Sequence, residues 1–315
     1  MRRKIASRGA VDTADMAQRL LVISPVRNEA DHLERVARAM AAQTRPPDLW
    51  LLVDDHSTDG TYEIAERLAN EFPFIDAVRA PEHPPLANPR DRLASAAAPR
   101  TFNFGLESVE WQAFTHLSKL DGDMELPPEY FERILGEFDS DPSLGMAGGL
   151  RTELVDGQWW LERIPTEHHV PGALKCYSRE CFEAIGGMQE RLAWDAIDEK
   201  LARMHGYRTR TFEYLVAVHH RPWGSADGTL RGRARYGTAD YISQAPFYWA
   251  VLRACKFAAA KPRGIGGLAF LYGYARAAVR RTPRFEDGEF RRAVRRETRA
   301  RVLGRLPLSS RTATG

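Results

Sequence analysis

Short apolar runs that alternate with polar loops and helical segments constrain the fold of this chain more than any other feature. The runs cover 20–23, 49–53 and 74–78, and helix patterns separate them. Unbroken apolar runs are typical of strands that are buried on both faces. Strand, loop and helix in repetition indicate a parallel α/β sheet with right-handed crossovers. Ligands bind outside the carboxyl ends of such strands, so we expect a site where these runs end.

A pair of carboxylates follows another apolar stretch, 114–117, which predicts a short buried strand that ends at Lys119-Leu120-Asp121-Gly122-Asp123. Residues i and i+2 point the same way in extended backbone, so Asp121 and Asp123 can aim at one point. Gly122 lets a ligand approach the backbone closely. Two such carboxylates suit Mg²⁺ or Mn²⁺ with a bound phosphate in the coordination shell. Asp-Gly is also an ordinary turn dipeptide, so a strand-to-turn corner is the alternative.

Composition excludes several classes of protein. The chain has 315 residues, 43% of them apolar, and its net charge of +3 does not indicate a general nucleic-acid binder. Cys176, Cys181 and Cys255 form no Cys-x-x-Cys pair, so we expect reduced thiols in a cytosolic chain. No long apolar run follows the basic residues 1–4, and no segment reaches the ~20 apolar residues that span a bilayer. Neither a secretory signal nor a transmembrane helix is expected.

The remaining elements follow from hydrophobic periodicity and from helix start and stop signals. Helices are predicted over 31–40, 103–114, 127–138, 179–185 and 195–205 and from 247 and 268 onward, and strands over 146–155, 170–177 and 207–219. Residues 80–100 are rich in Pro, Ala and Arg and lack periodicity, which indicates an active-site loop or an insertion.

The order and spacing of six motifs resemble those of the family-two glycosyltransferases. The motifs are Ile23-Ser24-Pro25-Val26-Arg27-Asn28-Glu29, Val53-Asp54-Asp55-His56-Ser57-Thr58-Asp59-Gly60-Thr61, Asn103-Phe104-Gly105-Leu106, Lys119-Leu120-Asp121-Gly122-Asp123, Gly186-Gly187, and Trp194-Asp195 with Asp198-Glu199. The resemblance implies a GT-A, Rossmann-like α/β fold with a mostly parallel central sheet flanked by helices. It also implies a lead-in segment over 1–18, a nucleotide-sugar-binding catalytic domain over 19–225, and a helical, basic C-terminal region over 226–315.

The resemblance implies a nucleotide-sugar site at the strand ends. The implied residues are Pro25, Asn28, Glu29, Asp54, Asp55, Arg100, Asn103, Lys119 and Asp121. The alternative for Asp54 and Asp55 is a solvated turn capped by Ser57 and Thr58. The alternative for Arg100 and Asn103 is a helix start with Asn103 near the N-cap.

The resemblance also implies a divalent metal, Mg²⁺ or Mn²⁺, on the donor diphosphate. Asp123 matches the direct ligand, and Asp121 matches a contact to the ribose or the metal. A histidine ligand is expected at the end of a later strand, where strand alternation lets only one of His219 and His220 face the site, and His219 is favoured.

The expected reaction inverts the anomeric centre and forms no covalent enzyme intermediate. Asp195 matches the general base, although a Trp stands where the family often has Glu, and Trp194 is expected to stack on acceptor or sugar. Asp198 and Glu199 lie on the same helical face, where they would orient the base or bind acceptor hydroxyls. A helix N-cap is the alternative role for Asp195.

The C-terminal region is basic and partly apolar. Residues 276–305 contain eleven Arg and four acidic residues, and apolar segments lie at 247–252 and 268–274. Such helices suit the headgroup region of an anionic membrane, and two core helices followed by a solvated basic helix are the alternative. The resemblance implies a glycan or polyprenyl-linked acceptor and a cytoplasmic protein, peripheral on the inner face of the plasma membrane.

Two other functions compete with the transferase. A phospho-acceptor receiver domain would place its acidic pair after the first strand and would be far shorter, and 119–123 has no role in it. A non-catalytic nucleotide-sugar or glycan-binding scaffold at the membrane would not need Asp123 and Asp195, since neither is required for folding.

Overall fold

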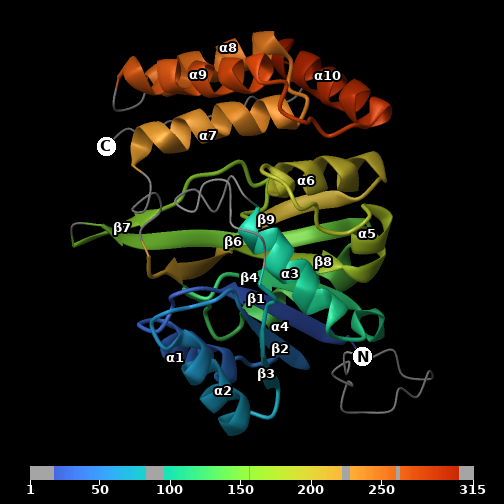
Figure 1. Cartoon of the computed structure of the whole chain (residues 1–315). Helices are drawn as coiled ribbons and strands as arrows, with labels where there is room; N and C mark the ends of the chain where they lie inside the picture. Colours follow the sequence, from blue (N-terminus) through green and yellow to red (C-terminus); the bar gives the residue numbers. More distant parts are fainter. Residues whose placement is uncertain (1–17, 83–95, 156, 222–227, 260–262, 305–315) are drawn as a thin grey trace.

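The computed structural model describes residues 18–82, 96–155, 157–221, 228–259 and 263–304 (Figure 1). Its strands are β1 (Leu20–Val26), β2 (Leu49–Asp54), β3 (Ile75–Arg79), β4 (His116–Leu120), β5 (Met124–Glu125), β6 (Leu144–Val155), β7 (Gln158–Leu161), β8 (Leu174–Ser178) and β9 (Arg208–His219). Its helices are α1 (Leu33–Ala41), α2 (Thr61–Glu71), α3 (Ala97–Glu107), the short 3₁₀ helix η1 (Trp111–Ala113), α4 (Tyr130–Ser140), α5 (Arg179–Ala184), α6 (Trp194–Met204), α7 (Thr229–Ile242), α8 (Phe247–Ala259), α9 (Ile265–Val279) and α10 (Gly288–Val302).

The strands form one sheet in the order β3-β2-β1-β4-β8-β6-β9-β5, and β7 pairs with β6. The first four strands in this order run parallel. β8 runs antiparallel to both β4 and β6, whereas β6 and β9 run parallel. The predicted α/β class is confirmed. The sheet is mixed because β8, in the middle of the strand order, runs antiparallel to both of its neighbours.

Two predicted helix starts are wrong. Local hydrogen bonds explain where the first helix begins and where the second ends. Asp31 does not cap α1, because the Glu29 carbonyl accepts the N–H groups of His32 and Leu33 and so begins the helix at Leu33. The helix predicted over 103–114 begins at Ala97 and ends at Glu107, where the Ser108 hydroxyl donates back to the Phe104 carbonyl at 2.8 Å. Most of the loop predicted over 80–100 lies outside the described residues.

Apolar cores cover both faces of the sheet. β1 and β2 are buried on both sides, as their unbroken apolar runs predict. Residues of α1, α2 and α4 fill one core, and residues of α3, α5 and α6 fill the other. α3 lies close to the sheet at Gly105, where an added Cβ would be 2.7 Å from Val53 Cγ2. This packing holds the carboxyl ends of β1 and β2 in place.

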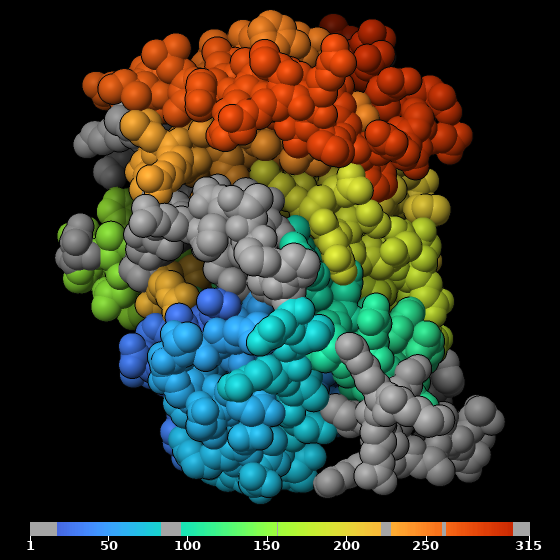
Figure 2. Space-filling model, in the orientation of Figure 1, coloured from blue at the N-terminus to red at the C-terminus, as the bar shows by residue number. Residues whose placement is uncertain are grey.

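The C-terminal helices form a layer over the α6 side of the sheet (Figures 1 and 2). α7 and α9 touch backbone to backbone, because an added Cβ at Gly237 or Gly273 would lie 1.9 Å from Phe270 O or 1.8 Å from Ala234 O. Phe290 and Val294 of α10 are buried in the same core as the apolar face of α6. The layer therefore packs directly on the helix that carries Asp195. No helix of the described residues is both long and apolar enough to cross a membrane.

Candidate active site

The loops after β1, β2 and β4 meet at one edge of the sheet. β1 pairs with β2 up to Val26 and Asp54, and with β4 up to Ile23 and Lys119. Gly122 permits the contact between the first and third loops, because an added Cβ would lie 2.8 Å from Val26 Cγ1. The sequence predicted that Gly122 makes room for a ligand; in the structure its close neighbour is the first loop of the protein itself.

Asn28 and Glu29 hold the first loop to the second. Asn28 has a left-handed backbone (φ 54°), and its side-chain oxygen accepts the Thr58 N–H at 2.9 Å. The Glu29 N–H donates to Thr61 Oγ1 at 2.7 Å. Pro25 is half-buried and pairs with Val53 in the sheet register. These contacts fix the shape of the loop that is predicted to hold the nucleotide.

Asp54 and Asp55 are both buried, which rules out a solvated turn. Asp54 accepts the Ser57 N–H at 3.2 Å and the Arg79 Nε–H at 3.0 Å, so its carboxylate organises the second loop. The Asp55 N–H donates to the Val26 carbonyl at 2.9 Å.

Arg221 lies two residues after β9 and contacts the first loop from there. No role was predicted for it from the sequence. Its guanidinium donates to Glu29 Oε2 and to the Asn28 carbonyl, both at 2.8 Å. Burial raises the pKa of Glu29 to about 8, and the nearby charge of Asp123 adds to this while Arg221 opposes it. A basic residue directly after the two histidines is the signal that could have identified it.

Asp123 and His219 face each other across the β5–β9 pair. His219 Nε2 lies 3.4 Å from Asp123 Oδ2, and both side chains are at least nine-tenths buried. Adjacent ligands of an octahedral Mg²⁺ at about 2.1 Å are separated by about 3 Å, so this spacing fits two ligands of one cation. The described residues contain no cluster of three or more His, Cys, Asp or Glu that could hold a metal.

Glu153 holds His219 in this orientation. Its Oε1 lies 2.9 Å from His219 Nδ1, which leaves Nε2 for the site. Burial disfavours charge on the imidazole, but Asp123 and Glu153 outweigh it and raise the pKa of His219. His220 points elsewhere, since its Nε2 lies 2.7 Å from Glu125 Oε2. The geometry supports His219 over His220.

Asp121 does not join this pair. Its carboxylate accepts a hydrogen bond from the ammonium of Lys119, whose side chain is almost fully buried. Lys119 also lies 5.5 Å from the centre of the Trp194 ring. We therefore set aside Asp121 as a direct metal ligand, because Lys119 already neutralises its carboxylate.

Asp195 lies in the first turn of α6 and is half-buried. The N-cap of this helix is Ala193, so the N-cap alternative for Asp195 is wrong. The Lys175 ammonium donates to the Asp195 carbonyl at 2.8 Å and lies 5.4 Å from the Trp194 ring. Gly172 leaves room beside them, since its added Cβ would be 3.2 Å from Trp194 and 3.3 Å from Asp195 Cβ.

Asp198 and Glu199 are buried behind Asp195 and surround Lys175. The Lys175 ammonium donates to Asp198 at 3.0 Å and to Glu199 at 3.4 Å, and Tyr177 donates to Asp198 at 2.6 Å. His169 Nδ1 lies 2.9 Å from Glu199. With side chains only 1% and 6% exposed, the two carboxylates are too buried to bind acceptor hydroxyls, and they hold the Lys175 ammonium against the Asp195 backbone.

Asn103 and Arg100 lie on α3, beside the loop that precedes α6. Asn103 donates to the Met188 carbonyl at 2.9 Å and to Glu190 at 3.1 Å. It lies inside the helix, whose N-cap is Ala96, so the N-cap alternative for Asn103 is wrong. Arg100 is half-buried in the first turns of α3.

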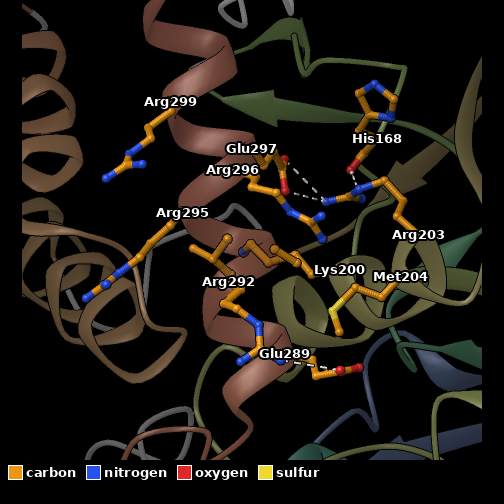
Figure 3. Close-up of a pocket in the computed structure, with 12 residues that line it drawn as sticks. His168, Lys200, Arg203, Met204, Glu289, Arg292, Arg295, Arg296, Glu297 and Arg299 are labelled. Carbon is orange, nitrogen blue, oxygen red and sulfur yellow. Dashed lines mark hydrogen bonds and ion pairs between the residues drawn. The ribbon is translucent and has the colours of Figure 1, made fainter.

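A wide basic groove of about 770 Å³ lies elsewhere, between α6 and α10 (Figure 3). Lys200, Arg203, Arg292, Arg295, Arg296 and Arg299 supply its cations. Glu297 pairs with Arg203 at 3.4 Å within it. None of the predicted site residues lines this groove.

Known proteins resemble the chain in sequence and in fold. The family model described as glycosyl transferase family 2 matches residues 21–180. The succinoglycan biosynthesis protein ExoA of Rhizobium meliloti (strain 1021) is 25% identical, with 84% of this chain and 87% of that protein covered.

Two solved glycosyltransferase structures share the fold. The mannosyltransferase PcManGT from Pyrobaculum calidifontis, solved with GDP-Man and Mn²⁺, is 18% identical with a TM-score of 0.54, covering 91% of this chain and 81% of that one. S. aureus TarS 1-349 with UDP-GlcNAc is 16% identical with a TM-score of 0.52, covering 90% and 83%.

Proposed function

The chain belongs to glycosyl transferase family 2, and we propose that it moves a sugar from a nucleotide diphosphate sugar, with UDP-sugars favoured, to a hydroxyl of a glycan or polyprenyl-linked acceptor. The observation that carries this proposal is the pairing of Asp123 with His219 at the strand ends. Pro25, Asn28, Asp55 and Asp121 are proposed to contact the nucleotide, and Asp54 to organise its loop. The GDP-Man and UDP-GlcNAc complexes of the structural relatives support a nucleotide-sugar donor.

A divalent cation fits the donors that the site offers. The carboxylate of Asp123 and the imidazole of His219 would hold Mg²⁺ or Mn²⁺, with His219 oriented by Glu153. When bound, the cation would neutralise the charge of the leaving nucleotide diphosphate. Mn²⁺ in the mannosyltransferase complex supports this assignment.

Asp195 is proposed as the general base. As the acceptor hydroxyl attacks the anomeric carbon, its proton passes to the Asp195 carboxylate and the bond to the nucleotide diphosphate breaks, which inverts the anomeric centre. Lys175 fixes the backbone of Asp195, and the Trp194 ring lies beside it as a surface for a sugar. A non-catalytic scaffold, the competing function, would not need the buried network around Lys175 that holds the backbone of Asp195.

Removal of either metal-binding side chain is expected to weaken donor binding. In calorimetric titrations of UDP with Mn²⁺, Asp123→Asn and His219→Gln should each lower affinity by at least about 10-fold, because each removes a ligand of the cation. His220→Gln is the matched control and should bind normally, since His220 pairs with Glu125. A panel of UDP- and GDP-sugars with and without EDTA tests the reaction. If no nucleotide sugar is bound or consumed, the proposed function is wrong.

We further propose that the outer face of α8 and α9 rests on an anionic membrane at the inner face of the plasma membrane. Large apolar side chains are exposed there, including Phe247 (63%), Leu268 (68%) and Tyr272 (62%). Residues 247–281 contain seven Lys and Arg and no acidic residue. Arginines on α10, in the same layer, add positive charge. An apolar face bordered by cations suits the headgroup region of anionic lipids.

Binding to vesicles tests this surface. The protein is expected to sediment with phosphatidylcholine–phosphatidylserine vesicles and to do so less at high salt, because surface charge is screened. Leu268→Ser should weaken binding by about 10-fold, since it removes an apolar side chain that would be buried in the lipid headgroup region. Tyr214→Ser, at an exposed aromatic residue on β9 outside this surface, should have no effect. Equal binding to purely neutral vesicles would contradict the electrostatic part of the proposal.

A further inference from the structure

The β6–β7 hairpin extends the sheet face that carries His219, and this face is called the wall of the candidate site below. In the sheet register Glu153 of β6 pairs with His219 of β9 on one side and with Trp160 of β7 on the other. Directly paired residues point to the same face of a sheet. His219, Glu153 and Trp160 therefore lie in one row on the face that looks toward Asp123. Trp160 is two strand spacings from His219, about 10 Å.

The same face carries polar groups on either side of Trp160. Arg151, two residues before Glu153, pairs with Glu162 at 2.7 Å and adds its charge to the surroundings of Asp121. On β7, Gln158 and Glu162 flank Trp160 at i−2 and i+2, so all three share one face. The wall is thus an indole with an amide and a carboxylate beside it.

Trp160 is far more exposed than the side chains that lie between it and Asp123. Its side chain is 51% exposed, whereas Glu153, Arg151 and His219 are 17%, 12% and 10% exposed. β7 pairs with β6 and has its other edge free in the described part of the sheet. An exposed indole in the same row as Glu153 and His219 offers a flat apolar surface beside polar groups. Trp159 is 60% exposed but points to the opposite face, beside Leu154.

We infer that Trp160, with Gln158 and Glu162, forms the acceptor subsite and binds a saccharide ring. One face of a pyranose consists of C–H groups, which pack on an indole, while its hydroxyls hydrogen-bond to amide and carboxylate groups at the ring edge. This inference rests on the proposed function, because a donor diphosphate held at Asp123 and His219 leaves the Trp160 end of the wall for the acceptor. It assigns the acceptor side of the site to a carbohydrate.

Saturation-transfer NMR on the full chain with UDP and Mg²⁺ tests the subsite. The probes are methyl β-glucoside, methyl β-galactoside, methyl β-mannoside and their disaccharides. The unmodified protein is expected to bind at least one probe, with the strongest transfer to ring C–H protons. Trp160→Ala should weaken that binding by about 3- to 10-fold, the range expected for loss of an aromatic contact. Trp160→Phe should restore most of it.

Trp159→Ala is the matched control and should bind the probe normally, because the Trp159 indole lies on the other face of the same strand. Affinity for UDP with Mg²⁺ should be the same in all variants. The inference is overturned if no probe binds, if both variants lose binding equally, or if Trp160→Ala weakens nucleotide binding instead. Its failure is distinguishable from failure of the proposed function. The proposed function predicts EDTA-sensitive donor turnover even if Trp160 binds no saccharide.

Discussion

Asp195→Asn is expected to lower kcat for sugar transfer by about 10²–10⁴-fold while UDP-sugar affinity stays within about twofold, because the change removes a general base and keeps the shape of the side chain. Asp195 lies in the first turn of α6, and Lys175 holds its carbonyl at 2.8 Å, so the backbone of the variant should not move. Transfer measured with saturating donor gives kcat, and calorimetry gives the donor affinity.

Glu190→Gln is the control for the Asp195 variant. Glu190 is an exposed carboxylate in the loop before α6, so its loss changes the same local charge without touching the proposed base. This control should transfer sugar at the normal rate. Unchanged turnover in Asp195→Asn would remove Asp195 from the mechanism, and equal losses in both variants would point to loop geometry instead.

Lys175→Met is expected to destabilise the fold by about 3–5 kcal/mol, because it leaves the buried carboxylate of Asp198 without its cation. Lys175 is fully buried, with its ammonium 3.0 Å from Asp198 and 3.4 Å from Glu199. Urea unfolding at pH 7 measures the free energy difference. Lys200→Met, on α6, is the control and should change it little, since the Lys200 ammonium donates to a backbone carbonyl, that of Ala196, at 3.4 Å.

The pH dependence of the Lys175 variant has a defined sign. Without the ammonium, burial holds the folded-state pKa of Asp198 above its unfolded value, whereas the nearby His169 still lowers the pKa of Glu199. Carboxyls with raised folded-state pKa values cost stability as pH rises through the unfolded pKa, so the deficit of the variant should shrink as pH falls toward about 4. Lys175→Met with Asp198→Asn should recover part of the loss at pH 7. A deficit that is independent of pH would show that packing, and not charge, is what Lys175 supplies.

The strand-end site could be predicted because its determinants are local. Unbroken apolar runs identify buried strands, and acidic loops directly after them mark the carboxyl edge of a parallel sheet. Asp54, Asp55, Asp121 and Asp123 all lie within three residues of such a strand end. Strand alternation likewise lets only one of His219 and His220 face Asp123, and in the structure His219 does so.

The partners of these residues could not be predicted, because they are distant in the chain. Glu153 lies 66 residues from His219, and Arg221 lies 192 residues from Glu29. Each reaches the site through strand pairings whose register depends on the whole mixed sheet. The pair Asp198 and Glu199 shows the same limit. Their spacing places both on the helical face of Asp195, yet only the position of Lys175 on β8 shows that they are buried behind it.

The sequence by itself determined the α/β class, the family, and which acidic loops follow the strand ends, because hydrophobic period and short motifs act over a few residues. The tertiary structure alone decided what surrounds those loops: β8 running antiparallel, Glu153 behind His219, Lys175 beneath Asp195, and the helical layer packed on α6. These features arise from contacts between distant segments, whose energies depend on complementary packing that no local pattern records.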